Sequence, residues 1–364
     1  MSDFYAAVFG AGITGTAIAA ALRDKGKSVL LIDPHVLENA PGAPAGLVNP
    51  ATGRHARLSW RSEECMPLLR HRIEAISSHT GKVNLISDSG VLRPAVNENL
   101  AQNFLESLNN YEWPKGWIQW LDPKETQGIN RYVGDNYGAL WLDCGFTVFV
   151  DRYLNAYRQY LREKGTECRY EPANYNEITG KDSFRIHFDS GYTATAEHVI
   201  VAAGWKTPQF SDWQYLNLHL VKGQVAVYEA DHDLDWQHGV SAMGYSLRRG
   251  ERTIIVGSTY EHKFENTDTT NKALIQLSKK RDVMLPGLNG RASLKHQLAG
   301  VRVTTPNKLP VIGRHKEKKN LCIYSGMGSK GLLYSEYTAG ILANHLVDGT
   351  EIEKDLSTDR FTPN

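Results

Sequence analysis

The chain has 364 residues, of which 41% are hydrophobic and 22% are charged; these are ordinary values for a globular protein, and the length favours two domains. Its formal net charge of +1 gives no overall attraction to nucleic acid or to an anionic membrane, although a local basic patch stays possible. The four cysteines (Cys65, Cys144, Cys168 and Cys322) form no Cys-x-x-Cys pair, which argues against a zinc site and a disulfide framework and fits a reducing, cytoplasmic location.

The N-terminal stretch predicts a strand, a glycine-rich turn, a helix and a second strand in close succession. Residues 6–9 are apolar, and an unbroken Gly-x-Gly-x-x-Gly runs from Gly10 to Gly15. Residues 16–25 have helical spacing, and the apolar run at 28–32 ends at Asp33. This order indicates a βαβ unit of the kind that binds dinucleotides.

Each part of this unit has a predicted role. Gly10 allows the tight turn, Gly12 lets the backbone approach a pyrophosphate, and Gly15 lets helix and strand pack closely. The helix start, with Ile13 and Thr14, offers free N–H groups and a partial positive charge. Asp33 follows Gly15 by eighteen residues, where a carboxylate accepts hydrogen bonds from an adenosine ribose.

The same residues admit a second interpretation, because residues 4–22 carry no charge and are long enough to span a bilayer. They are, however, rich in Gly, Ala and Thr, and the glycines fall on the fingerprint. No basic segment precedes them, so a signal peptide has little support. We therefore treat this stretch as a soluble βα unit.

The segment 34–51 is rich in proline and glycine and is predicted to be an extended loop. Its small residues would let the backbone lie against a flat ligand, and we assign Pro34, Ala45, Gly46 and Leu47 to the cofactor site; the alternative is a flexible connector. A cluster of basic residues follows. It is either the solvated face of a helix or a group that attracts an anionic substrate. It consists of Arg54, His55, Arg57 and Arg61.

The rest of the chain alternates between predicted helices and strands. Helices are expected at 60–78, 97–110, 151–164 (capped by Asp151), 271–281 and 332–346. Strands are expected as a pair within 82–93 turned at 88–90, then at 140–150, 166–170, 184–188 and 192–195 (a hairpin), 198–201, 218–229, 245–248 and 253–258 (paired), and 321–324. Residues 297–303 lead back toward the first domain.

Two strand ends add to the predicted cofactor site. The strand at 198–201 runs into Ala202, Ala203 and Gly204, whose backbone could lie against the dinucleotide at the carboxyl edge of the sheet. Asn174, after the strand at 166–170, is assigned there too. The strand at 321–324 leads into a second glycine-rich turn and helix start, which binds anions or carbonyl oxygens and implies one fold closed by both termini. We assign to the site its residues Gly328, Ser329, Lys330, Gly331 and Leu332.

The N-terminal fingerprint together with the C-terminal Gly-Ser-Lys-Gly helix start resembles the FAD-dependent D-amino-acid-oxidase superfamily, which includes glycine oxidase, sarcosine oxidase and D-amino-acid dehydrogenase. The resemblance is closer still to the oxidase domain of the bifunctional tRNA 5-methylaminomethyl-2-thiouridine biosynthesis protein. Besides the fingerprint, three stretches carry the likeness: 300–313, 328–332, and Gly244-Tyr245 followed by 256–260.

Two features of the sequence depart from the family pattern. No fused methyltransferase domain fits in this length, and position 300, a flavin-linking Cys in sarcosine-oxidase-like members, is Gly here. The resemblance thus implies non-covalent FAD.

The reaction that the resemblance implies is oxidation of a C–N bond next to a carboxylate, by hydride transfer to flavin N5 and hydrolysis of the imine in water. Arg302 matches the family position that binds the substrate carboxylate, a role suited to a bidentate guanidinium; the alternative is a structural arginine. Tyr245 matches a substrate-side tyrosine or is a sheet aromatic. Lys330 would stabilise the reduced flavin or face solvent. We expect no metal.

We therefore predict an α/β fold with a Rossmann-like FAD-binding domain from 1–80, 146–210 and 299–364. A substrate domain with a largely antiparallel sheet would come from 81–145 and 211–298. The predicted substrate is a small N-substituted glycine or D-amino acid, with the electron acceptor open and no membrane span. The alternatives are a tRNA wobble-uridine carboxymethylaminomethyl oxidase, disfavoured by the near-neutral charge, and a non-catalytic flavin-binding protein.

Overall fold

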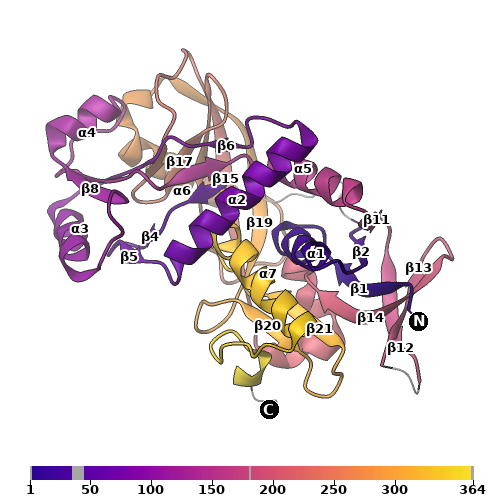
Figure 1. The fold of residues 1–364 in the computed structure, drawn as a ribbon. Coiled ribbons are helices and arrows are strands. Elements are labelled where there is room, and N and C mark those ends of the chain that lie inside the picture. The colour runs from indigo at the N-terminus through magenta and orange to yellow at the C-terminus, as the bar shows by residue number, and fades with distance from the viewer. Residues whose placement is uncertain (1, 35–44, 180–181, 362–364) are drawn as a thin grey trace.

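The structure is a computed structural model and describes residues 2–34, 45–179 and 182–361. Two large sheets dominate it, and a layer of four helices packs beside the first sheet (Figure 1). The α/β class expected from the sequence is confirmed, with a mainly parallel sheet and a largely antiparallel one. The division into two domains stays a prediction.

The first sheet is mainly parallel, and its antiparallel pairs all lie beyond β1, where β14 pairs with β13, β13 with β12, and β21 with β20. β1 lies between β2 and β14, both parallel to it, and the far edge of β14 pairs first with β13 and then with β21. Its strands are β1 (Phe4–Phe9), β2 (Val29–Ile32), β11 (Glu167–Arg169), β12 (Ala173–Glu177), β13 (Phe184–Phe188), β14 (Thr193–Val201), β20 (Val311–Arg314) and β21 (Leu321–Ser325). The parallel strands are short and almost continuously apolar because both faces of the sheet are covered.

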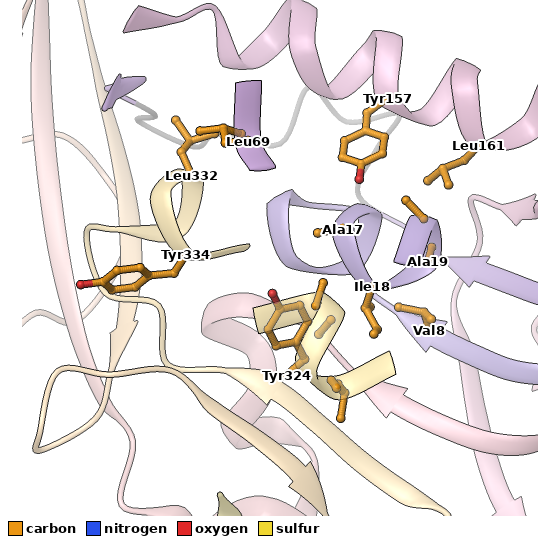
Figure 2. Close-up of a cluster of buried hydrophobic side chains, with 14 of the residues drawn as sticks. Val8, Ala17, Ile18, Ala19, Leu69, Tyr157, Leu161, Tyr324, Leu332 and Tyr334 are labelled. Carbon is orange, nitrogen blue, oxygen red and sulfur yellow. The ribbon is translucent and has the colours of Figure 1, made fainter. Parts of the chain in front are cut away.

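Four helices pack on one another and against this sheet: α1 (Ile13–Asp24), α2 (Ser62–Thr80), α5 (Val150–Glu163) and α7 (Gly331–Asp348). Helix α1 is buried on nearly every side, and its alanines let the sheet, α5 and α7 approach closely. Figure 2 shows Ala17 and Ile18 of α1 among side chains from these neighbours, including Tyr157 and Tyr324. The N-terminal and C-terminal helices lie side by side (Figure 1), so the prediction that both termini close one fold is confirmed.

The second sheet runs in the order β19, β15, β18, β17, β16, β7, β9, β8, with only the β16–β7 pair parallel. Its strands are β7 (Val91–Pro94), β8 (Ile118–Leu121), β9 (Ala139–Leu142), β15 (His219–Ala230), β16 (Gly239–Ser241), β17 (Tyr245–Arg248), β18 (Thr253–Gly257) and β19 (Ala292–Thr304). Helix α6 (Asn271–Met284) packs against β15 and β18, and α3 (Glu98–Asn110) and α4 (Pro123–Ile129) lie near β9 and β8. Smaller sheets are β3 (Leu47–Val48) with β10 (Phe146–Val148) and β6 (Ile86–Ser87), and β4 (Ala51–Thr52) with β5 (Arg57–Leu58).

Three local predictions are wrong. The stretch 82–93 does form two short strands on either side of 88–90, but they do not pair with each other, because β6 pairs with β10 while β7 pairs with β9 and β16, where Val91 and Leu92 become fully buried. The stretch 140–150 is two strands separated by a turn, in which Gly145 donates to the carbonyl of Leu142. Asp151 does not cap α5, which begins one residue earlier; its carboxylate pairs with Arg249 instead (2.8 Å).

Residues 4–22 form a strand, a turn and a helix rather than one continuous helix, so the βα interpretation is confirmed. Within the described ranges, the helices are all too short or too polar to cross a membrane.

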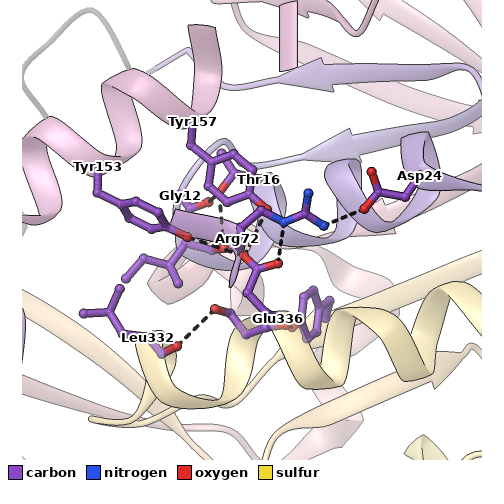
Figure 3. A network of polar contacts seen from close by, with 11 residues as sticks. Gly12, Thr16, Asp24, Arg72, Tyr153, Tyr157, Leu332 and Glu336 are labelled. Atoms are coloured by element: carbon purple, nitrogen blue, oxygen red, sulfur yellow. Dashed lines mark hydrogen bonds and ion pairs between the residues drawn. The ribbon is translucent and has the colours of Figure 1, made fainter. Parts of the chain in front are cut away.

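A polar network crosses the helix layer near the glycine-rich turn (Figure 3). Glu336 of α7 accepts hydrogen bonds from Arg72 of α2 (3.1 Å) and from Tyr157 of α5 (2.9 Å). The other end of the Arg72 guanidinium donates to Asp24 of α1 (2.6 Å). All four helices are therefore fixed to one another beside the turn.

Candidate functional site

The three glycines of the N-terminal turn have different surroundings. Gly10 has φ = +114°, and a Cβ there would lie 2.3 Å from the carbonyl oxygen of Ala202. A Cβ on Gly15 would lie 1.7 Å from the carbonyl oxygen of Gly10, so only glycine lets α1 pack against β1. A Cβ on Gly12 would meet nothing within 4 Å. Gly10 and Gly15 therefore shape the turn, while Gly12 borders open space at the N-terminus of α1, where a phosphate group fits.

Asp33 lies at the end of β2, and its Oδ2 accepts a hydrogen bond from the backbone N–H of Ala11 (2.8 Å). The carboxylate thus holds the glycine turn in shape, and its contact with a ribose stays a prediction. The end of β14, which was also predicted to border the cofactor, lies beside the glycine turn. The N–H of Ala202 donates to the carbonyl of Phe9 (2.8 Å), and its carbonyl accepts from the Thr14 hydroxyl (3.5 Å). Ala203 and Gly204 follow directly, at the carboxyl end of β14.

Arg158 of α5, which the sequence analysis missed, also supports the turn by donating to the carbonyl of Ala11 (3.2 Å). Burial is the main cause that lowers the pKa of this guanidinium. Beside it is a cavity of about 550 Å³ whose lining includes four cations and an aromatic ring. These are Lys82, Arg152, Arg158, Arg162 and Tyr170. The combination suits an anionic, flat ligand next to the dinucleotide turn.

Asn174 lies elsewhere. It is on the edge strand β12, paired with His187 of β13, and its side chain is exposed. The alternation of β12 directs Tyr175, rather than Asn174, toward Phe9 of β1, whose ring it meets edge-on. The structure therefore does not bring the Asn174 side chain together with the glycine turn. Pro34 directly follows Asp33, and residues 35–44 of the predicted loop are outside the described residues.

The end of that loop joins the first sheet region to the second sheet. Gly46 has φ = +79°, and its carbonyl accepts a hydrogen bond from Val148 (2.7 Å). The flanking residues Ala45 and Leu47 pack against an apolar cluster on the second sheet. That cluster is formed by Val225, Val227, Leu247 and Ile255, with Tyr245 and Leu298 at its edge. The predicted cofactor loop therefore lies directly against the sheet that carries Tyr245.

The second glycine turn reaches the same region. A Cβ on Gly331, at the start of α7, would lie 3.9 Å from the side chain of Ile13, so the N-termini of α7 and α1 are neighbours. Gly328 has φ = +55° and donates to Val303 of β19 (2.7 Å). Ser329 is exposed and Leu332 is buried in the core of Figure 2. Two helix N-termini thus contribute positive potential to one place.

Lys330 is the residue before α7 and is half-buried. Its Nζ donates to the hydroxyl of Tyr334 (3.1 Å). Burial and the nearby charge of Lys308 lower its pKa. The side chain is therefore not simply a solvent-facing lysine, and its contact with a flavin stays a prediction.

The second sheet presents Arg302 from β19, and its guanidinium is only partly paired. Nη2 donates to the hydroxyl of Ser258 (2.7 Å), and the ring of Tyr260 lies 4.9 Å from Cζ. Nη1 is buried and has no hydrogen-bond partner among the described residues. Gly223 of β15, which pairs with Gly300, makes room for it, because a Cβ there would lie 2.4 Å from Nη1.

Tyr245 of β17 lies beside this arginine. Its ring packs on Gly257, and its buried hydroxyl has no hydrogen-bond partner in the described part of the chain. Burial raises the pKa of this phenol, while the charge of Arg302 partly opposes the rise. The phenol therefore stays protonated at neutral pH and can donate. Two buried donors from different strands are left unpaired, which an anionic ligand with two oxygens would satisfy.

Ser258 and Lys280 of this site were missed as functional residues. Ser258 belongs to the hairpin stretch that carries the family likeness, whereas nothing in the sequence singles out Lys280. Its Nζ donates to the backbone carbonyl of Ser258 (2.6 Å) from α6. Burial and the charge of Arg302 lower the pKa of Lys280.

The remaining candidates are accounted for in simpler ways. In the basic cluster, Arg54 donates to His55 (2.9 Å) and Arg61 pairs with Glu64 and Glu353 (both 3.0 Å). Burial raises the pKa of Cys65 and Cys322 to about 12, so these thiols are small hydrophobes. Among the described residues, none of the His, Cys, Asp and Glu side chains form a group of three or more suited to a metal.

The sequence and the fold of this chain were compared with those of known proteins. A family model described as FAD dependent oxidoreductase (DAO) matches residues 6–345. The tRNA 5-methylaminomethyl-2-thiouridine biosynthesis bifunctional protein MnmC of Thiobacillus denitrificans is 25% identical over 94% of this chain and 56% of its own length. Glycine oxidase of Bacillus licheniformis is 25% identical over 93% of this chain and 92% of its own. The crystal structure of glycine oxidase from Geobacillus kaustophilus superposes with a TM-score of 0.82 at 19% identity, covering 100% of this chain and 99% of that one. This chain therefore spans little more than half the length of the bifunctional relative.

Proposed function

Because this chain belongs to the DAO family of FAD-dependent oxidoreductases, we propose that it oxidises the C–N bond of a small amine or amino acid that carries an α-carboxylate. The substrate class in this proposal is an N-substituted glycine or a D-amino acid. Two full-length likenesses support it, since glycine oxidases resemble the chain in both sequence and fold. The bifunctional tRNA relative is matched over only part of its length.

The observation that carries the proposal is the pair of unpaired donors on the second sheet. Arg302 Nη1 and the Tyr245 hydroxyl are both buried without a partner in the described residues. Leaving a buried donor unpaired costs about 1–3 kcal/mol, so the pair favours binding of a group that accepts from both. A carboxylate has two oxygens and the matching charge. In this proposal, Arg302 binds the carboxylate and Tyr245 fixes its orientation.

The cofactor would be held by residues that leave room for it. The open space at Gly12 and the N-termini of α1 and α7 suit the pyrophosphate and other electron-rich atoms. Ala45 and Leu47 would lie along the flat ring system, on the side facing Tyr245. When bound, FAD supplies the acceptor for the hydride removed from the carbon beside nitrogen. The protein orients the substrate: Arg302 and Tyr245 hold the carboxylate end, which places that carbon next to the loop.

The test is an anaerobic absorbance titration of the purified holoenzyme. The panel is glycine, N-methylglycine, N-carboxymethyl amines, D-amino acids and undermodified tRNA. Loss of the oxidised flavin band with a small carboxylate-bearing amine, abolished in Arg302→Ala, is the expected result. Loss only with tRNA would overturn the proposal in favour of the tRNA-modifying oxidase. A bound flavin that none of these compounds reduces would favour a non-catalytic flavin-binding protein.

A further inference from the structure

We propose that Lys280 binds a second anionic group of the substrate, so that the site selects amines bearing two carboxylates over amines bearing one. This inference rests on the proposed function and names the substrate class more closely. It assigns a specificity-determining role to a residue of α6, outside the strands that carry Arg302 and Tyr245.

The geometry places the two cations on opposite sides of one residue. Ser258 is 2% exposed; its hydroxyl accepts from Arg302 Nη2 (2.7 Å) and its backbone carbonyl accepts from Lys280 Nζ (2.6 Å). Lys280 therefore approaches Ser258 from helix α6, which packs against β15 and β18, and meets the partner of Arg302 just beyond the end of β18. An ammonium group has three donors, and this contact uses one of them.

The charge around this pair is not balanced. Neither Lys280 nor Arg302 forms an ion pair with any of the residues that the structure describes. The contrast with the next residue is direct, since Arg281 has its own partner in Asp282 (2.6 Å). The charge that acts on Lys280 is that of Arg302, which has the same sign. Two neighbouring half-buried cations repel each other, and two anionic groups bound together would relieve that repulsion.

Exposed side chains lie near Lys280 and Arg302, where a substituent that extends away from Arg302 would pass. Lys280 packs on Gly244, where a Cβ would lie 3.2 Å from its Cδ. The neighbouring Met243 is 56% exposed, and Tyr260, which stacks on Arg302, is 62% exposed. These two side chains form an accessible apolar rim beside the cations. The carbon chain of an N-substituent suits this rim, and its terminal charge suits Lys280.

The experiment compares two amines that differ only in one charge: iminodiacetate and its half-amide, N-(carbamoylmethyl)glycine. We expect the wild-type holoenzyme to prefer iminodiacetate in kcat/KM. In Lys280→Met this preference should fall by about tenfold to a hundredfold, which is the 1.5–3 kcal/mol of a hydrogen bond to a charged group. Lys280→Arg should retain most of it. Lys279→Met removes an exposed lysine of the same helix and should leave it unchanged.

Two results would overturn the inference. An equal loss for both amines in Lys280→Met would mean that Lys280 only positions Ser258 and Arg302. A wild-type preference that survives Lys280→Met would place the second anion elsewhere. A binding measurement separates this inference from the proposed function: malonate should perturb the flavin spectrum at lower concentration than its half-amide, and only while Lys280 is present. Absence of that difference refutes the role of Lys280 even if another amine proves to be the substrate.

Discussion

Arg72 Nε lies 3.1 Å from Glu336 Oε2, and this ion pair joins α2 to α7 with side chains only 14% and 5% exposed (Figure 3). Arg72 has a second partner in Asp24, whereas Glu336 depends on Arg72 for its only cation among the described residues. Burial raises the pKa of Glu336, and Arg72 with the Tyr157 hydroxyl offsets only part of that rise. Loss of Arg72 would therefore leave Glu336 without a cation, whereas loss of the Glu336 charge would leave Arg72 with Asp24.

This asymmetry predicts which substitution costs more stability. Arg72→Met leaves a buried carboxylate unpaired and should lower the free energy of unfolding by about 3–5 kcal/mol. Glu336→Gln keeps the shape of the side chain and leaves Arg72 paired with Asp24, so its cost should be smaller. Urea unfolding of the holoenzyme at neutral pH and fixed excess FAD measures both. Lys25→Met, which breaks the more exposed pair with Asp348, should cost no more than about 1 kcal/mol. The reverse order of the two buried substitutions would contradict this account.

A second prediction concerns acid stability. Burial lowers the pKa of His238 to about 4, and its ring is 6% exposed. The unfolded chain binds this proton near the ordinary value of about 6.5, so between these values the unfolded state holds more protons. Stability should therefore fall as pH drops from about 6.5 to 4. In His238→Gln, the fall in the free energy of unfolding between pH 6.5 and 4.5 should be smaller by about 2 kcal/mol. The part of the fall that comes from His198, whose pKa is also lowered to about 4, should remain. The exposed His71→Gln should leave the pH profile unchanged.

The glycine turn offers a third test, because Gly12 and Gly15 have different surroundings. Gly12→Ala places a methyl group in open space, so the protein should fold normally while its Kd for FAD rises at least tenfold. Gly15→Ala forces a methyl group to within 1.7 Å of the Gly10 carbonyl oxygen and should prevent stable folding. Circular dichroism and flavin titration of both variants distinguish the two effects. Unchanged FAD affinity in Gly12→Ala would place the cofactor elsewhere.

Gly223→Ala tests the position of Arg302 without removing it. The new methyl group would lie 2.4 Å from Nη1, and the flexible guanidinium would move away. We expect a folded enzyme whose kcat/KM for a carboxylate-bearing amine falls at least tenfold, mainly through KM. Gly340→Ala, in α7 with nothing within 4 Å of the added carbon, should instead stabilise the protein by about 0.5–1 kcal/mol and leave kinetics unchanged. Wild-type kinetics in Gly223→Ala would argue against substrate binding by Arg302.

The features that could be predicted from the sequence are those formed by residues close together along the chain. The unit from Gly10 to Asp33 could be recognised because its glycines, helix spacing and acid are local features of the chain. The predicted pairing of the two strands within 82–93 was wrong for the opposite reason. Its turn residues are a local signal, whereas the partners of β6 and β7 lie in two different sheets and come from distant parts of the chain.

The contacts that build the site were harder to predict because they join distant residues. Arg158 reaches Ala11 across 147 positions, and Arg302 reaches Ser258 across 44. Such pairs depend on sheet register and on how helices lie over the strands, which no local pattern encodes. Arg302 and Tyr245 were identified by family resemblance rather than by spacing. Lys280, on a helix outside the matching stretches, gave no comparable signal.

The claim that Arg302 recognises a substrate carboxylate is tested most directly by one rapid-mixing measurement. The holoenzyme is mixed anaerobically with the best amine of the panel and, separately, with the carboxamide of the same amine. We predict that the second-order rate constant of flavin reduction is at least a hundredfold lower with the carboxamide than with the amine. In Arg302→Gln, most of this difference between the two compounds should disappear. Equal rates in the wild type, or a difference that survives in Arg302→Gln, would contradict the assignment.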